Sequence, residues 1–134
     1  NLMASVEDLQ QEDYLKNDNN RLSAEIQQDL VNMRDHDDIM TELMGILTDI
    51  EVAPSVGRYY TFIYIAKTSL IEYDEFPLIA CVGVYPWGFR GLNYHWNDFH
   101  NYTWEECMSN FHLVYPNELE HMRSIPFQKF VLNK

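Results

Sequence analysis

The chain has 134 residues, of which 46% are hydrophobic and 14% aromatic, and its formal net charge is −12. This length and hydrophobic content suit one compact domain with an appendage. The negative charge disfavours binding to nucleic-acid phosphates or to an anionic membrane surface. No stretch approaches the roughly 18 consecutive apolar residues of a membrane span. From the charge and from this length argument together, we expect neither nucleic acid nor a membrane as a partner.

The composition changes sharply near residues 54–57. Residues 1–57 carry 13 acidic and 3 basic side chains, whereas residues 58–134 carry 8 acidic and 6 basic ones. All three Trp, all seven Phe and eight of the nine Tyr follow the change. We therefore expect an acidic helical segment over residues 1–56, acting as an oligomerisation or docking arm, and an aromatic-rich β domain over residues 57–134 that folds alone.

The acidic segment is expected to be helical. A short helix is predicted over Glu7–Leu15, and a longer one over residues 21–50, which lack proline and contain one glycine. Asp37 interrupts the longer helix, so Asp38 is an alternative cap for a second helix over Ile39–Ile50.

An apolar seam runs along residues 21–50. Its members recur at helical spacing and are Ile26, Leu30, Met33, Met40, Met44 and Leu47. Both a helix packed on its own domain and a helix paired with another chain fit this seam. The methionines favour a partner, because Met side chains adapt to irregular surfaces.

The second half of the chain is rich in β-forming residues. The predicted strands are residues 58–66, Leu78–Tyr85, Phe89–Trp96, Leu113–Tyr115 and Phe127–Leu132. Two short helices are predicted, one from Thr103 to Phe111, with Glu106 completing a capping box, and one over Asn117–Met122. Short strands with one or two helices favour an SH3-like half-open barrel. The predicted fold class is therefore α+β, with an N-terminal helical segment followed by this barrel.

Histidine and cysteine spacing predicts no metal site and no activated thiol. His95 and His100 are separated by four residues and Cys107 precedes His112 by five, and neither spacing matches a zinc-ligand pair. Cys107 is predicted inside a helix, not at a helix N-terminus where its pKa would fall. We expect Cys81 and Cys107 to be free thiols, and we expect no metal, no cofactor and no enzymatic activity.

An acidic loop supplies the strongest enzymatic alternative. Glu72, Asp74 and Glu75 precede the second strand, and two carboxylates can hydrolyse a glycosidic bond. A cell-wall or carbohydrate hydrolase is therefore one alternative to protein binding. The competing interpretation is a loop that positions Arg90 through an ion pair. A third alternative is an accessory protein of nucleic-acid metabolism whose acidic helix imitates the charge of DNA.

Four segments carry a resemblance to a known family. They are Tyr-Thr-Phe-Ile-Tyr-Ile-Ala-Lys-Thr (60–68), Glu-Tyr-Asp-Glu-Phe-Pro-Leu (72–78), Trp-Gly-Phe-Arg-Gly-Leu-Asn-Tyr-His-Trp (87–96) and Asn-Tyr-Thr-Trp-Glu-Glu (101–106). Together they resemble small domains of large tailed bacteriophages, over residues 57–112. The resemblance implies a structural protein of the virion, assembled in the host cytoplasm, with other virion proteins or copies of itself as partners.

The same motifs predict a binding surface. Asn93 and His95 lie two residues apart in the predicted strand and are expected to share one face. The other face is expected to carry Arg90, Leu92, Tyr94 and Trp96. The residues that we expect to bind a partner are Tyr73, Asp74, Trp87, Arg90, Asn93, His95 and Trp96.

Overall fold

The computed structural model describes Tyr14 and residues 21–32, 36–67, 72–124 and 130–132. The helices are α2 (Ala24–Asn32), α3 (His36–Ile46) and α4 (Leu119–Ser124), with 3-10 turns at Trp104–Glu106 and Pro116–Glu118. The strands are β1 (Ile50–Glu51), β2 (Tyr59–Thr61), β3 (Glu72–Asp74), β4 (Leu78–Tyr85), β5 (Gly88–Asn93), β6 (Asp98–Thr103), β7 (Phe111–Val114) and β8 (Phe130–Leu132).

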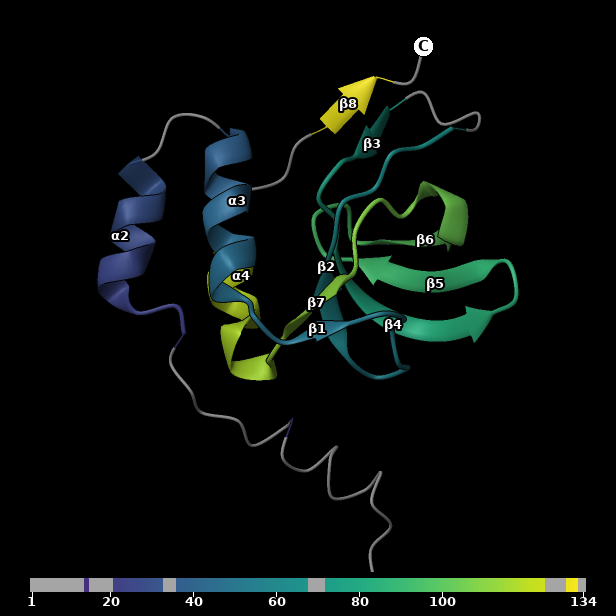
Figure 1. Ribbon diagram of the computed structural model, residues 1–134, viewed down its shortest axis with the longest axis horizontal. Coiled ribbons are helices and arrows are strands. Elements are labelled where there is room, and N and C mark those ends of the chain that lie inside the picture. Colours follow the sequence, from purple (N-terminus) through teal and green to yellow (C-terminus); the bar gives the residue numbers. More distant parts are fainter. Residues whose placement is uncertain (1–13, 15–20, 33–35, 68–71, 125–129, 133–134) are drawn as a thin grey trace, which may run out of the picture.

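Six of these strands form one antiparallel sheet in the order β1-β7-β2-β4-β5-β6. The remaining two, β3 and β8, pair with each other. Figure 1 shows α2, α3 and α4 on one side of the large sheet and the β4–β5 hairpin reaching away from them. The molecule therefore has a helical layer against one part of a sheet and an uncovered hairpin beyond it.

The predicted SH3-like half-open barrel is wrong, because the sheet is open. After β6 the chain leaves through a 3-10 turn, makes a single bridge between Tyr64 and Cys107, and returns as β7 on the far side of β2. This return places β1 and β6 at opposite ends of the sheet. The strands β1, β3 and β6 were not predicted from the sequence, and without β6 the order of the strands in the sheet cannot be inferred.

The predicted N-terminal helical segment is also corrected. Two short helices, α2 and α3, replace one long helix. Ser23 explains where α2 begins, because its hydroxyl accepts the backbone N–H of Ile26 at 3.3 Å, as an N-cap does. The second helix begins at His36, so Asp38 lies inside it and does not precede it. The helix predicted at Glu7–Leu15 lies outside the described residues, apart from Tyr14.

Of the other predicted elements, one strand is confirmed and one helix is wrong. The strand Leu78–Tyr85 is confirmed residue for residue. The helix predicted from Thr103 is wrong, since only a 3-10 turn forms there. No capping bond forms at Thr103. The buried Glu106 carboxylate instead accepts the Thr103 hydroxyl at 2.5 Å, the Tyr64 hydroxyl at 3.2 Å and the Lys67 backbone N–H at 2.5 Å.

One face of the sheet encloses an aromatic core. Alternate residues of β2 and its extension, namely Tyr60, Phe62 and Tyr64, point into this core, as the two-residue period of a strand requires. The ring centroid of Phe62 lies 5.0 Å from that of Phe111 and 5.4 Å from that of Tyr102. Such tilted and edge-to-face pairs stabilise a core by about 0.5–1.5 kcal/mol each beyond their buried area.

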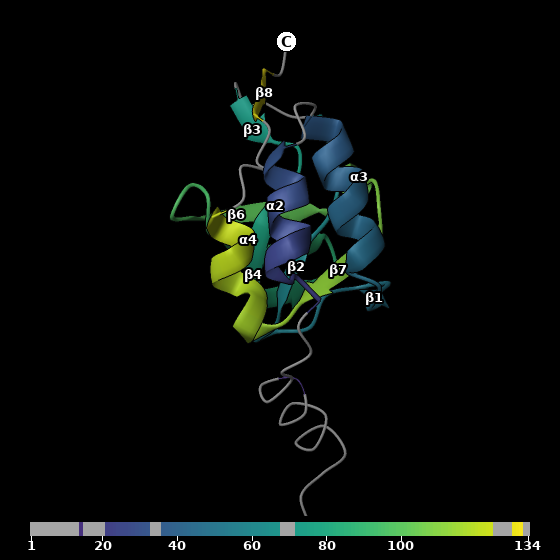
Figure 2. The ribbon, with the colours of Figure 1, turned by 90° about the vertical axis from the view of Figure 1, so that its left-hand side faces the viewer.

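The helices cover the opposite face. Figure 2 shows α2, α3 and α4 in front of the sheet. A second core fills this interface and contains Leu22, Ile39, Met40, Leu43, Leu47, Phe76, Leu78, Val114 and Met122. Whether residues 57–134 fold without the helices stays a prediction, but the helices contribute about half of this core.

Polar contacts fasten the N-terminal part to the sheet. The Tyr14 hydroxyl donates to the Val114 carbonyl at 2.8 Å and accepts the Tyr59 N–H at 2.9 Å. The Arg21 guanidinium donates two hydrogen bonds to the Glu118 carboxylate, at 2.6 and 2.8 Å. The bonded residues are about 45 to 100 positions apart in the sequence, so these contacts join the N-terminal part of the chain to the sheet and to the turn before α4.

We expect Leu43→Ala in α3 to lower the free energy of unfolding by about 2–5 kcal/mol, because a fully buried leucine leaves a cavity when truncated. The measurement is urea-induced unfolding followed by circular dichroism. The matched control is Val52→Ala, whose side chain is 84% exposed and whose loss should matter little. Equal effects of the two substitutions would show that the helices are an appendage and not part of the core.

Candidate functional site

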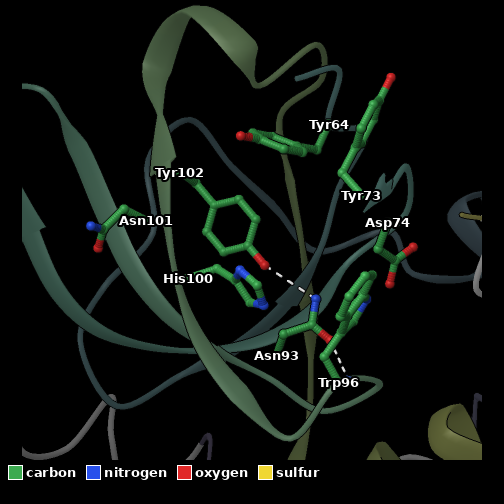
Figure 3. Close-up of a pocket in the computed structure, with 8 residues that line it drawn as sticks. All are labelled: Tyr64, Tyr73, Asp74, Asn93, Trp96, His100, Asn101 and Tyr102. Atoms are coloured by element: carbon green, nitrogen blue, oxygen red, sulfur yellow. Dashed lines mark hydrogen bonds between the residues drawn. The ribbon is translucent and has the colours of Figure 1, made fainter. Parts of the chain in front are cut away.

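A narrow pocket opens where β3, the end of β5 and β6 meet (Figure 3). We call it the aromatic pocket, and it is lined by Tyr64, Tyr73, Asp74, Asn93, Trp96, His100, Asn101 and Tyr102. Its empty volume is about 300 Å³, which includes solvent at its mouth. Most of this volume is open space at the mouth, and the enclosed part has room for about one water molecule.

A buried carboxylate–imidazole pair forms one wall of the pocket. Asp74 Oδ2 lies 2.6 Å from His95 Nδ1, and the two side chains are 2% and 4% exposed. The other carboxylate oxygen, Oδ1, accepts the Phe76 N–H at 3.0 Å. This bond closes a local turn of the type that aspartate favours, and Pro77 restricts Phe76 to extended backbone at the same point.

Asn93 organises the turn between β5 and β6. Its side-chain oxygen accepts the backbone N–H groups of His95 at 2.8 Å and Trp96 at 3.1 Å. Its side-chain nitrogen donates to the Tyr102 hydroxyl at 3.1 Å. Asn97, with φ of 54°, completes the turn in the left-handed region that asparagine tolerates. The orientation of His95 and Trp96 therefore follows from one buried amide.

Tyr64 and Tyr102 do not act as acids or bases near neutral pH. Burial raises the pKa of Tyr102 far above its ordinary value. Burial, and then the charge of Glu106, raise the pKa of Tyr64 in the same way. Both hydroxyls stay protonated, so they serve as neutral hydrogen-bonding groups and as aromatic walls.

The thiols are not activated. Burial, followed by the charge of Glu106, raises the pKa of Cys107 from 9.0 to about 12, and its Sγ donates to the Thr103 carbonyl at 3.3 Å. Burial also raises the pKa of Cys81. A nucleophilic cysteine needs a lowered pKa, so neither thiol has the electrostatic setting for catalysis.

The described residues bring together no group of three or more His, Cys, Asp or Glu side chains that suits a metal ion. One imidazole nitrogen of the pocket is nevertheless unusual. His100 Nε2 is buried, and within the described part of the chain it has no hydrogen-bond partner. Buried polar atoms are almost always paired, so this atom needs an explanation.

The structure gathers most of the predicted surface residues at the aromatic pocket, namely Tyr73, Asp74, Asn93, His95 and Trp96. It does not bring Trp87 and Arg90 there. The residues that the sequence analysis missed are Tyr64, His100, Asn101 and Tyr102. The alternation of His100 and Tyr102 along β6 would have placed these two on one face, had residues 98–103 been assigned as a strand.

Trp87 and Arg90 belong to a second region, which we call the exposed hairpin surface and which consists of Tyr85, Trp87, Arg90 and Phe99. The rings of Tyr85 and Trp87 stack at 5.1 Å with an interplanar angle of 6°. Arg90 Cζ lies 5.1 Å from the Phe99 ring centroid, and Arg90 Nη1 donates to Asn101 Oδ1 at 3.3 Å. The predicted ion pair between Arg90 and the acidic loop does not form among the described residues.

The predicted helix seam lies largely inside the molecule. Met40 and Leu47 are buried in the core between helices and sheet, and Ile26 and Met44 pack at its margin. The side chains of Leu30 and Met33 lie outside the described part of the chain. Contact of this seam with another chain stays a prediction.

Comparisons with models of known protein families, with curated proteins and with solved structures give no match. The similarity to phage domains inferred from the sequence therefore stays an expectation. Within the described residues, no helix has the length and apolar character needed to cross a membrane.

We expect Asp74 and His95 to stabilise the fold as a coupled pair. Asp74→Asn and His95→Gln should each be strongly destabilising, because each leaves its partner buried and poorly satisfied. The double variant should lose less than the sum, with a coupling of about 0.5–3 kcal/mol in urea unfolding. Asp98→Asn, at an exposed carboxylate on β6, is the control and should change little. Strict additivity would mean that the pair does not interact.

We also expect stability to fall in alkali. The pKa of Cys107 is higher in the folded state, about 12, than its ordinary value of 9.0, so above pH 9 the unfolded chain loses a proton that the folded chain keeps. The contribution is complete below pH 9 and is lost as the pH rises toward 12. Urea midpoints at about pH 8 and about pH 10.5 should show the fall, and Cys107→Ala should make it shallower. Equal slopes for the parent and the variant would contradict this assignment.

Proposed function

We propose that this chain is a structural or assembly component of a tailed-phage virion and that it acts by binding other proteins, not as an enzyme. The exposed hairpin surface is the observation that carries the binding part of this proposal. The phage setting rests on the similarity of residues 57–112 to phage domains. The expected partners are other virion proteins or further copies of this chain, met in the virion after assembly in the host cytoplasm.

The exposed hairpin surface has the composition of a protein interface. Tryptophan, tyrosine and arginine dominate the binding energy of interfaces, and all three types occur here without cover from the helices. Trp87 is 46% exposed, although it is stacked on Tyr85. Stacking holds both rings in place before binding, so less side-chain entropy is lost when a partner docks.

Local backbone geometry keeps this surface rigid. A Cβ atom at Gly88 would lie 1.9 Å from the Tyr102 carbonyl oxygen, so only glycine allows β5 and β6 to approach this closely. Trp104 Nε1 donates to the Pro86 carbonyl at 3.1 Å and fixes the hairpin turn beside Trp87. A rigid turn that carries exposed aromatic rings suits recognition better than catalysis.

Asp74 gives the hydrolase alternative no support. Both oxygens of the Asp74 carboxylate already accept hydrogen bonds within the protein. A glycosidase needs one carboxyl group that donates a proton to the substrate and a second that faces it. Asp74 instead has the environment of a structural group.

The test is incorporation into particles. Trp87→Ala should leave the thermal midpoint nearly unchanged and lower the amount of this chain in purified virions by about ten-fold or more, as for a hot-spot residue that contributes 2 kcal/mol or above. Met108→Ala is the matched control, because Met108 is also about half exposed but lies outside the hairpin surface. Absence of the parent chain from virions would overturn the structural role. Equal incorporation of the Trp87 and Met108 variants would remove the hairpin surface as the docking site.

A further inference from the structure

We propose that the exposed hairpin surface of one copy binds the acidic outer side of the helices α2 and α3 of a second copy, so that copies join head to tail. We call this outer side the acidic helical surface, and its exposed acidic residues are Glu25, Asp29, Asp38 and Glu42. The inference rests on the proposed function for the role of the hairpin surface and deepens it by naming the partner of that surface.

The exposed hairpin surface carries a positive charge and no negative one. Residues 78–93, which include β4 and β5, contain no Asp or Glu, although the chain has 21 of them. Asp98 of β6 pairs with Asn93, so it lies on the face of the sheet opposite to Arg90. In a chain with a net charge of −12, this surface therefore suits an acidic partner.

The guanidinium group of Arg90 is held in place but has no acidic partner. Its Cζ lies 5.1 Å from the Phe99 ring centroid, and its Nη1 donates to Asn101 Oδ1 at 3.3 Å. A guanidinium has five N–H donors in a planar fork that matches a carboxylate, so most of these donors remain for a partner. Among the described residues, Arg21 and Arg58 have carboxylate partners, whereas Arg90 has none.

The helical layer of the same chain supplies the complementary charge. Glu25 and Asp29 lie four residues apart in α2 and share one side of that helix. Asp38 and Glu42 have the same spacing in α3. Neither helix contains Lys or Arg, and none of these four carboxylates has an ion-pair partner within the described part of the chain. Like charges at this spacing destabilise a helix, so a cation from another copy stabilises it.

The position of the two surfaces in the molecule suits contact between copies. Figure 1 shows the helices at one end and the β4–β5 hairpin at the other. The helices cover part of one face of the sheet, and the exposed hairpin surface continues that face beyond them. The helices of a second copy placed there extend this cover. Because two different surfaces meet, the contact is heterologous and can repeat from copy to copy.

The overall charge sets the conditions in which this contact forms. Two copies that each carry a net charge of −12 repel one another over long distances. At about 150 mM salt the screening length is about 8 Å, so this repulsion is weakened more than an ion pair in direct contact. The association is therefore measured at that salt concentration.

The direct test is sedimentation equilibrium of the full chain. The parent chain should associate with a Kd on the order of 0.1 mM, as a small polar interface allows. Arg90→Glu reverses the charge of the exposed hairpin surface and should weaken the association at least about ten-fold. Lys67→Glu is the matched control, because it changes the net charge equally at an exposed residue outside both surfaces. A parent chain that stays monomeric up to about 1 mM, or equal effects of the two substitutions, would overturn the proposal.

A mixture of two variants tests the head-to-tail geometry. The second variant neutralises the acidic helical surface and combines Glu25→Gln, Asp29→Asn, Asp38→Asn and Glu42→Gln. It removes the like-charge pairs, so its thermal midpoint should be no lower than that of the parent. Each variant alone should associate at least about ten-fold more weakly than the parent.

The Arg90→Glu variant keeps an intact acidic helical surface, and the fourfold variant keeps an intact exposed hairpin surface. Their equimolar mixture should therefore form a heterodimer with about the Kd of the parent and should grow no further. A mixture that stays as monomeric as its two components would show that these surfaces do not bind each other.

The two proposals fail in different ways. If the chain is absent from virions but associates through Arg90, the virion role fails and the head-to-tail contact survives. If the chain is present in virions and the parent stays monomeric in solution, only the head-to-tail contact fails.

Discussion

The ion pair between Arg21 and Glu118 decides how the helices lie on the sheet. Its two hydrogen bonds, at 2.6 and 2.8 Å, join the segment before α2 to the connection between β7 and α4, and the Arg21 side chain also donates to the Leu113 carbonyl at 3.2 Å. Burial alone would lower the pKa of Arg21, but the hydrogen bonds and charge of Glu118 outweigh it and raise the pKa. Because a buried charge that loses its partner is very unfavourable, this paired geometry strongly constrains the helical layer.

The two candidate surfaces follow from the position of that layer. The helices cover the sheet where Leu78 and Val114 lie, and β4, β5 and β6 extend beyond them (Figure 1). On the helical side, the uncovered part of these strands presents Arg90 and Phe99 to solvent. On the other side, the aromatic core ends at the polar network of Asp74, where the pocket opens. One surface is exposed because none of the described helices covers it, and the other is accessible because the aromatic core ends there.

How much the sequence predicts depends on how local each feature is. The strand Leu78–Tyr85 is predicted correctly because Pro77 and Pro86 flank its apolar run and mark its two ends. The shared strand face predicted for Asn93 and His95 is wrong, because β5 ends at Asn93 and both His95 and Trp96 lie in the turn that the Asn93 side chain holds. The open sheet does not follow from local sequence, because β7 pairs with β2 only after the chain has passed through β4, β5 and β6. The helix expected from Thr103 fails for the same reason, since Glu106 binds groups about forty residues away.

The register of β5 links the two surfaces. Side chains of a strand alternate between faces, so a slip of one residue would bring Arg90 into the aromatic core and turn Asn93 to solvent. The bulge between Cys81 and Gly83 sets this register on the β4 side. Gly91 sets it against the core, because a Cβ atom there would lie 3.1 Å from the Ile79 Cβ and 3.4 Å from the Tyr102 ring. Gly91 therefore helps to hold Asn93 of the pocket and Arg90 of the exposed hairpin surface on opposite faces of the same strand.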